Sequence, residues 1–292
     1  MNKNLGFLAT IIIVAIVLFF ASQYVDLNQA LQVLAKANIA LIVAALVLET
    51  VSMALKTLKW KTLLSEINPD IKFAELFKIQ LLGIAASNIT PARVGEATKV
   101  FYLEKHGVKK RLTLLTIVWE HLFDIIAIVL FSTLAATIYG SIAAIFLLAT
   151  LALAVIAYNI DFVVKKLSGF KQLAFLSEFT LHKFRKSTLA KCTLIALLAW
   201  GTELLAIVLA FHAVGATLPP LQIIGTYAIS IIIGLISTIP GGLGSLDATL
   251  FLLLKNSAPA ATLTAAIIAA RLVTIGWIYL LGALSALTMH KK

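Results

Sequence analysis

The stretch Ser87-Asn88-Ile89-Thr90-Pro91-Ala92-Arg93-Val94-Gly95-Glu96 places a proline, a glycine and two charged residues at the end of an apolar run. A second break, Pro240-Gly241-Gly242-Leu243-Gly244, begins 149 residues after the first proline (240 minus 91), close to half of the 292-residue chain. Aligning the two prolines makes both breaks read Pro-x-x-(apolar)-Gly. Two interrupted apolar segments at matching places in two halves are typical of transporters with a substrate site between inverted repeats. The alternative is two unrelated helix ends that use the same helix-breaking residues.

The composition indicates an all-α polytopic membrane protein. Hydrophobic residues make up 61% of the chain and charged residues 13%, about half the share of a soluble protein. The mean hydropathy is +1.03, and apolar stretches of spanning length recur from residue 5 to residue 288. The single cysteine, Cys192, excludes an internal disulfide and a cysteine-based metal cluster.

The formal net charge is +11, and the positive residues are unevenly distributed. Nineteen of the 24 Lys and Arg residues fall in 56–72, 93–111, 159–191 and the last two positions. The segments that would face the other side carry only Lys36 and Lys255. This is the positive-inside pattern, so we expect these four regions and both termini in the cytoplasm, with the protein in the plasma membrane of a prokaryote. Anionic lipid surfaces attract such clusters, and nucleic-acid binding is not expected.

The apolar runs predict six full spans and two re-entrant hairpins. The spans are Leu5–Ser22, Ile39–Lys56, Leu112–Ser132, Ser141–Ala157, Cys192–Ala213 and Pro259–Met289. We expect Val25–Ala37 to be a short polar connection and residues 158–191 to be a cytoplasmic connector. The lysines of 56–61 are expected to snorkel to the membrane interface beside Trp60.

The two hairpins are predicted from the lengths of the apolar runs. Ile79–Thr90 is an uncharged run of twelve residues, which as a helix reaches about 18 Å, short of the roughly 30 Å hydrocarbon core. Both of its flanks are expected on the cytoplasmic side. Leu218–Lys255 would enter and leave from the other side, although Leu218–Ile239 alone is long enough to cross. The prediction is one transmembrane domain over 1–292, with inverted 3+3 repeats over 1–135 and 136–292.

Ionisable residues inside a membrane are costly and mark functional cavities. The predicted buried network is Glu120, His121, Asp124 and Glu203. The predicted substrate-binding residues are Asn88, Thr90, Arg93, Glu96, Gly241, Gly242, Gly244, Ser245, Asp247 and Arg271, and the hairpin breaks are Pro91, Gly95 and Pro240. Arginines near both breaks suit an anionic group such as phosphate, and a helix N-terminus after Gly244 would add free N–H groups. The alternative role of each charge is pairing between helices.

Several kinds of enzymatic site are not supported. Glu120, His121 and Asp124 are too few ligands on one short segment, and no His-x-x-x-His motif or cysteine pair completes a metal site. Gly244-Ser-Leu-Asp is not the Gly-x-Gly-Asp motif of intramembrane proteases, and the sequence has no nucleophile elbow or P-loop. We expect no metal and no cofactor.

The motifs Pro91-Ala-Arg-Val-Gly-Glu96, Trp119-Glu-His-Leu-Phe-Asp124, Pro240-Gly-Gly-Leu-Gly244 and Arg271, with Lys56–Leu64, resemble the transmembrane domain of lysylphosphatidylglycerol synthetase/flippase proteins and their stand-alone relatives. The resemblance covers essentially the whole chain in the same order. It departs at His121, where the family usually has arginine, and at Asp247, where glutamate is common. His121 would make the site sensitive to pH. In full-length members a soluble domain attaches the amino acid from aminoacyl-tRNA, and because this chain ends at Lys292 we expect no synthetase activity.

The resemblance implies a flippase-like transporter, not an enzyme. Its substrate would be an anionic or aminoacylated phospholipid, or a polyprenyl-phosphate-linked lipid. Arg93 and Arg271 would hold the phosphate, and the carboxylates would balance them or bind a cationic headgroup or a proton. The expected partners are membrane lipids, while a separate lipid-modifying synthetase and a homo-oligomer are left open. The alternatives are an intramembrane enzyme that acts on a lipid phosphate with carboxylates as acid and base, and an accessory membrane subunit.

Overall fold

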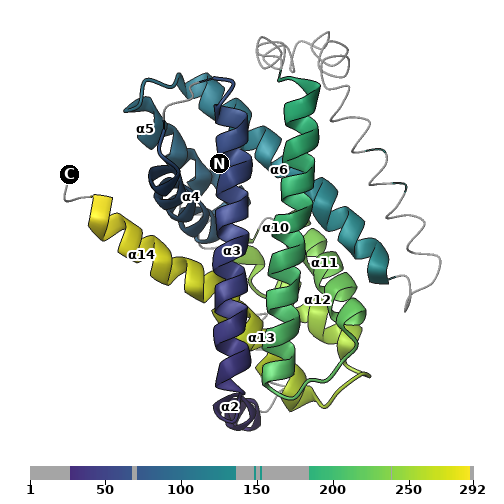
Figure 1. Cartoon of the computed structure of the whole chain (residues 1–292). Helices are drawn as coiled ribbons and strands as arrows, with labels where there is room; N and C mark the ends of the chain where they lie inside the picture. Colours follow the sequence, from purple (N-terminus) through teal and green to yellow (C-terminus); the bar gives the residue numbers. More distant parts are fainter. Residues whose placement is uncertain are drawn as a thin grey trace, which may run out of the picture.

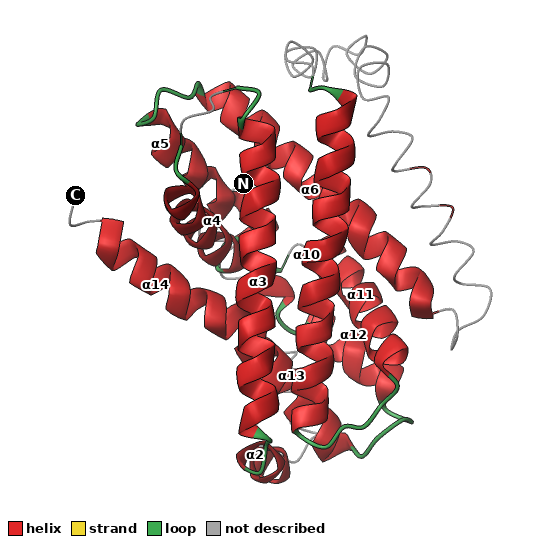
Figure 2. Ribbon diagram, viewed as in Figure 1, coloured by secondary structure: helices red, strands yellow, loops and turns green. Residues whose placement is uncertain are grey.

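The computed structural model describes residues 27–67, 71–135, 148, 152, 184–237 and 239–289, and the regular structure in these ranges is helical (Figure 2). Four helical stretches there are long and apolar enough to span a membrane: α3 (Ile39–Leu64), α6 (Lys110–Ser132), α10 (Lys186–Ala213) and the continuous run Ala260–Met289. This confirms the prediction of a helical membrane protein. The predicted span Leu5–Ser22, nearly all of Ser141–Ala157 and most of the connector 158–191 lie outside the described residues.

Helices α3 and α10 run side by side along most of their lengths and form the centre of the molecule (Figure 1). Small residues allow the two backbones to approach, since Ala45 and a series of α10 alanines are fully buried. Ser52 Oγ donates to the carbonyl oxygen of Ala199 at 2.9 Å in the middle of the pair. At one end, the backbone N–H of Asn38 donates to the carbonyl oxygen of Ala213 at 2.7 Å.

The remaining elements pack around this pair. They are α2 (Leu27–Ala35), α4 (Phe73–Asn88), η1 (Pro91–Ala97), α5 (Thr98–Glu104), η2 (Thr133–Ala135), α11 (Pro220–Ile236), η4 (Pro240–Gly242), α12 (Ser245–Leu254), α13 (Ala260–Arg271), the π-helical turn η5 (Leu272–Gly276) and α14 (Trp277–Met289). In Figure 1, α4, α5 and α14 lie to the left of the central pair, and α11 and α12 lie to the right. Helix α14 packs against α4, and α11 packs against α6.

Apolar side chains divide between a packed interior and an outward stripe. The largest buried cluster joins α10, α11, α12 and α13 around residues such as Phe211 and Ile223. Outward-facing Val43, Val47 and Val51 follow one another at helical spacing along α3. Such an exposed stripe is what a helix needs where it faces lipid tails, which are as apolar as its own side chains.

The structure corrects three sequence predictions. Residues Leu27–Ala35, expected to be a polar connection, form helix α2, which packs against α13. The span predicted to end at Lys56 continues to Leu64. Lys56, Lys59 and Trp60 do not extend outward from the helix but are buried against neighbouring helices, where carboxylates of α6 and α10 neutralise the two lysines.

The two breaks meet in space. Helix α4 ends at Asn88 before η1, and α11 ends at Ile236 before η4, and both α4 and η1 contact η4. The approach is close, since a Cβ atom added to Gly241 would lie 3.2 Å from the carbonyl oxygen of Asn88. Gly241 also has a φ of 59°, a left-handed conformation that favours glycine. The two segments singled out in the sequence therefore form one structural unit.

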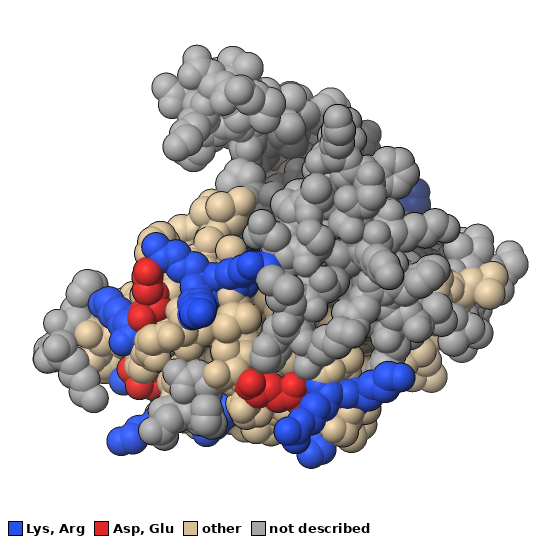
Figure 3. Space-filling view, turned by 90° about the horizontal axis from the view of Figure 1, so that it is seen from above, with Lys and Arg blue, Asp and Glu red and all other residues tan. Residues whose placement is uncertain are grey.

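Basic side chains gather at one end of the molecule. Figure 3 views this end from above, over the outer ends of α3, α5 and α10. Exposed cations of this region are Lys72, Lys105, Lys109, Lys110, Arg185, Lys186 and Lys191. At the opposite end, α2 is followed by Lys36. The charge asymmetry is thus present in three dimensions, while its assignment to the cytoplasmic side stays a prediction.

Candidate functional site

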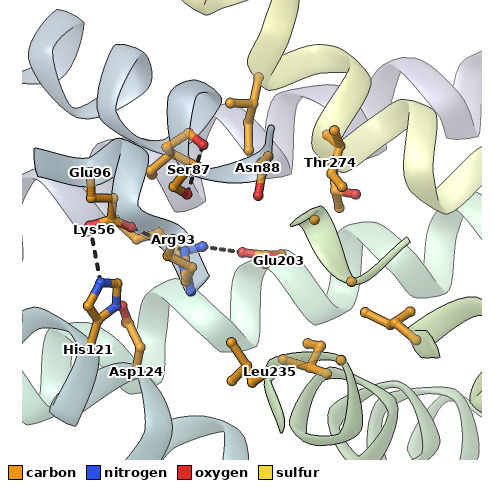
Figure 4. Close-up of a pocket in the computed structure, with 18 of the residues that line it drawn as sticks. Lys56, Ser87, Asn88, Arg93, Glu96, His121, Asp124, Glu203, Leu235 and Thr274 are labelled. Atoms are coloured by element: carbon orange, nitrogen blue, oxygen red, sulfur yellow. Dashed lines mark hydrogen bonds and ion pairs between the residues drawn. The ribbon is translucent and has the colours of Figure 1, made fainter. Parts of the chain in front are cut away.

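A cavity of about 340 Å³ lies where the two breaks meet (Figure 4). A cavity of this volume is within the range of small-molecule sites. Its polar lining residues are Lys56, Gln80, Ser87, Asn88, Thr90, Arg93, Glu96, Lys99, Glu120, His121, Asp124, Trp200, Glu203, Tyr227, Arg271 and Thr274. Helices from both halves of the chain therefore contribute to one wall.

Most of the residues predicted to form the site line this cavity. They are Asn88, Thr90, Arg93, Glu96, Gly241, Gly242 and Arg271, together with the whole predicted network of Glu120, His121, Asp124 and Glu203. Gly244, Ser245, Asp247 and the break residues Gly95 and Pro240 do not line it, and the side chain of Pro91 lies outside what the structure describes.

At the start of α12, Leu246 lines the cavity, while the polar groups of Gly244, Ser245 and Asp247 are engaged with one another and with the second break. The backbone N–H of Gly244 donates to Asp247 Oδ2 at 3.0 Å. Ser245 Oγ lies 2.8 Å from Ser237 Oγ and donates to the carbonyl oxygen of Gly242 at 3.3 Å. A capped helix start has fewer N–H groups left for an anion, so these contacts favour a structural role for Gly244, Ser245 and Asp247.

Lys99 holds two carboxylates from different elements together. Its Nζ lies 3.2 Å from Glu96 Oε2 and 3.0 Å from Glu120 Oε2, and its side chain is 1% exposed. The ammonium also lies 4.8 Å from the ring centroid of Trp60. Gly83 makes room for the lysine stem, because a Cβ there would lie 2.7 Å from Lys99 Cε. The result is a compact, fully buried charge cluster that joins η1, α5 and α6.

Two further buried pairs join α3 to its neighbours. Lys56 Nζ lies 2.5 Å from Glu203 Oε2 of α10 and 4.3 Å from the ring centroid of Trp200. Lys59 Nζ lies 2.5 Å from Asp124 Oδ1 of α6, and Trp200 Nε1 donates to the same oxygen at 2.9 Å. The i, i+3 spacing of the two lysines lets one helix face reach both partner helices.

Sequence reasoning missed these three lysines. A lysine at the end of an apolar run usually reaches the membrane interface, and Lys56 and Lys59 were interpreted in that way. Two local patterns in the sequence instead favour burial of these lysines. Lys56 and Lys59 are three residues apart on one helix face, and Lys99 follows Glu96 by three residues.

Arg93 is the most accessible cation of the cavity wall. Its side chain is 37% exposed, and NH2 lies 3.3 Å from Glu96 Oε1, which is its ion-pair partner within the described part of the chain. Glu96 Oε2 also lies 3.2 Å from His121 Nε2 (Figure 4). Because a guanidinium has five N–H donors, Arg93 keeps donor groups for a ligand in the cavity. Over the described ranges, His, Cys, Asp and Glu form no group of three that could hold a metal ion.

Arg271 also lines the cavity, but its donors are engaged. Its Nε and NH2 donate to Asp247 Oδ1 and Oδ2 at 2.6 and 3.0 Å. NH1 donates to the carbonyl oxygen of Gly241 at 2.9 Å, and NH2 also donates to that of Gly242 at 3.2 Å. This arginine ties α13 to α12 and to the second break.

Replacing Arg271 with lysine is expected to destabilise the second break. Lysine keeps the charge opposite Asp247 but cannot reproduce the planar fork that also reaches Gly241 and Gly242. We expect a loss of about 1–2 kcal/mol in the free energy of unfolding, measured by thermal unfolding in detergent. Lys255→Arg, at an exposed position after α12, is the control and should leave stability unchanged. Equal stability of Arg271→Lys and the control would show that the hydrogen bonds of Arg271 to Gly241 and Gly242 do not stabilise the second break.

Comparison with known proteins identifies similar chains. The family model described as "Lysylphosphatidylglycerol synthase TM region" matches residues 7–282, which include every residue of the cavity wall. The UPF0104 membrane protein PH1989 of Pyrococcus horikoshii is 24% identical over 285 residues, covering 84% of each chain. A UPF0104 membrane protein of Methanothermobacter thermautotrophicus is 25% identical over 257 residues, 73% of this chain and 75% of that protein. MJ1595 of Methanocaldococcus jannaschii is 30% identical over 131 residues, 43% of this chain and 39% of that protein.

Proposed function

Because the chain belongs to the lysylphosphatidylglycerol synthase TM region family, we propose that it moves the headgroup of a lipid between the two leaflets of the membrane. The lipid would be an anionic or aminoacylated phospholipid, or a polyprenyl-phosphate-linked lipid. The observation that carries this proposal is a charged cavity at the meeting point of two helix breaks, inside a domain of membrane-spanning helices. Ionisable groups that face such a cavity are expected to serve a polar substrate.

The cavity wall is balanced in charge. Its cations are Lys56, Arg93, Lys99 and Arg271, and its carboxylates are Glu96, Glu120, Asp124 and Glu203. A headgroup that carries a phosphate and an ammonium can exchange partners with such a wall without leaving a net charge unpaired. This matters because an uncompensated charge in a desolvated site costs several kcal/mol.

Arg93 is the phosphate ligand that the contacts favour. It is the exposed cation with spare donors, whereas Arg271 is occupied by Asp247 and two carbonyl oxygens. Guanidinium forks match phosphate oxygens in two-point contacts. The acyl chains would stay in the lipid, and an aminoacyl ammonium would bind among the carboxylates of the opposite wall.

We further propose the membrane path that the sequence predicted. Helix α4 with η1 and α5 would form one re-entrant hairpin, and α11 with η4 and α12 would form a second of opposite direction, within an inverted repeat. In support, α4 has 16 residues and α11 has 17, or about 24–26 Å of helix, which is short of the full core. The two tips contact each other, and non-helical backbone at such a depth must be buried or line a wet cavity.

The proposal is tested by reconstituting the protein into liposomes with fluorescent phosphatidylglycerol and lysyl-phosphatidylglycerol, and measuring the rate of leaflet exchange. In Arg93→Gln we expect exchange to fall to the rate of protein-free liposomes. The variant should still insert and fold, because the Arg93 side chain is partly exposed and loosely paired.

Lys72→Gln, which removes an exposed cation outside the cavity wall, is the control and should exchange lipid like the wild type. Exchange by Arg93→Gln at the wild-type rate would contradict the role of Arg93. Mass spectrometry of the same lipids separates transport from catalysis, because a transporter leaves the mass unchanged and an enzyme that acts on the lipid phosphate does not. A correctly inserted protein that neither exchanges nor converts any lipid would contradict the transport proposal.

A further inference from the structure

Glu49 is a buried acid that the proposed function does not use. It lies on α3 with 0% exposure. Within the described residues, neither of its carboxyl oxygens has a hydrogen-bond partner. The carboxylates of the cavity wall differ, since each has a lysine, arginine or histidine beside it. A charged carboxylate buried without a partner costs far more than a neutral carboxyl group.

Glu49 lies next to one of the ion pairs of the cavity wall. Ser52 and Lys56 follow it by three and seven residues, so the three side chains share one face of α3. Ser52 Oγ lies 3.5 Å from Glu203 Oε2, the oxygen that also lies 2.5 Å from Lys56 Nζ. A line of polar groups therefore runs from Glu49 along α3 to the Lys56–Glu203 pair.

In the part of the chain that the structure describes, few charged groups lie near Glu49. They are Lys56 of the same helix and Glu203 of α10, and Asp124 of α6 acts in turn on Lys56. Among the described residues, the other contacts of this part of α3 are uncharged, and they include Trp277 of α14, whose Nε1 donates to Thr50 Oγ1 at 2.9 Å. Helix α4 presents Leu81 and Ile84 near Met53, and η5 (Leu272–Gly276) contains no ionisable residue.

We propose that Glu49 is a proton-binding site. Its carboxyl group is protonated while Glu203 pairs with Lys56, and it loses the proton when Glu203 pairs instead with a cationic headgroup. This inference rests on the proposed function and names a proton as its coupling ion. The charges balance. When Glu203 leaves Lys56, the O–H bond of Glu49 breaks, its proton is released to solvent, and the Glu49 carboxylate becomes the counterion of Lys56. One positive headgroup bound is matched by one proton released.

Infrared spectroscopy tests the site without any transport. The purified protein at neutral pH should show the carbonyl band of a protonated carboxyl group, and Glu49→Gln should remove it. Glu203→Gln should remove it as well, because Glu49 then ionises to balance Lys56. Glu104→Gln, which removes a carboxylate from an exposed pair with Lys110, is the control and should leave the band unchanged. A band that survives in Glu49→Gln would overturn the site, and one that survives in Glu203→Gln would overturn its link to the ion pair.

Thermal unfolding gives a second, independent readout. Glu49→Gln replaces one neutral group with another, so its unfolding temperature should stay near that of the wild type. Glu203→Gln should lower it only moderately, because Glu49 can take over as counterion. The double variant leaves Lys56 without either carboxylate, so its loss should exceed the sum of the single losses. The proposal would be overturned if the loss in the double variant equalled the sum of the two single losses. It would also be overturned if Glu49→Gln alone lowered the unfolding temperature as much as the double variant does.

A pH gradient then tests the coupling in liposomes that contain fluorescent lysyl-phosphatidylglycerol. With one proton exchanged for each headgroup, a gradient of about one pH unit should drive the leaflet ratio of the labelled lipid toward about tenfold. In Glu49→Gln the gradient should produce no accumulation. If the wild-type protein exchanges the labelled lipid but the pH gradient does not change its leaflet ratio, the coupling to protons is wrong. Complete absence of wild-type exchange would overturn the proposed function, while the infrared result would still decide whether Glu49 binds a proton.

Discussion

Replacing Lys99 with methionine is expected to lower the free energy of unfolding by about 3–5 kcal/mol, enough to prevent recovery of folded protein in mild detergent. The reason is that Lys99 pairs with both Glu96 and Glu120, and both carboxylates are nearly inaccessible to solvent. Methionine fills a similar volume, so the loss reports the charge and not a cavity. Thermal unfolding and the fraction of monodisperse protein measure it.

A matched control uses the exposed pair of Lys110 and Glu104, whose charges lie 3.3 Å apart at the surface. Lys110→Met should cost no more than about 1 kcal/mol, because water screens such a pair. Adding Glu120→Gln to Lys99→Met should recover part of the loss, since the second buried charge is then removed. If Lys99→Met were as stable as Lys110→Met, the buried cluster would not be a determinant of the fold.

Gly95→Ala is expected to disrupt the first break. A Cβ at Gly95 would lie 2.2 Å from the carbonyl carbon and oxygen of Ala86 and 2.6 Å from the backbone nitrogen of Ser87. These are backbone atoms of α4, so η1 and α4 would have to separate. We expect the free energy of unfolding to fall by about 3 kcal/mol or more, which is at or above the largest losses usual for overpacked sites. Thermal unfolding measures it, and exchange of labelled lipid should be lost with it.

The separation would also break the hydrogen bonds that close this break. Thr90 Oγ1 accepts from the backbone N–H of Gly95 at 2.7 Å and donates to the carbonyl oxygen of Ala86 at 2.9 Å. Gly276→Ala is the matched control, because the nearest atom to its added Cβ is Leu272 Cδ2 at 3.6 Å, an ordinary contact. Equal unfolding temperatures for the two variants would show that the break tolerates a side chain at Gly95.

The charged residues of the cavity wall differ in how tightly they are paired and buried. The Lys99 cluster is fully buried and is expected to stay intact, as a rigid part of the wall. Arg93 is partly exposed, and the Lys56–Glu203 pair borders the cavity with each side chain 10% exposed. A transporter needs partners that can be exchanged for the substrate, and these are the groups to which we assign that role.

The sequence by itself determined the class of the protein and the place of its candidate site. Apolar runs of spanning length and helix-breaking residues are local signals, so α6 was predicted to within two residues at its start and α10 was predicted correctly at its end. The i, i+4 spacing of Glu120 and Asp124 predicted a polar helix face, and both side chains line the cavity. The two breaks were recognised because proline and glycine disrupt helices wherever they occur.

Only the tertiary structure decided which charges are buried and what neutralises them. Lys56 finds its carboxylate 147 residues away, Lys59 finds one 65 residues away, and Lys99 reaches Glu120 across 21 residues. The two arginines looked equivalent in the sequence, yet Arg271 closes on Asp247 and the second break, while Arg93 stays open to the cavity. The physical reason is that a charge can be buried only beside its counterion. That pairing depends on how the helices pack, which no local pattern of residues contains.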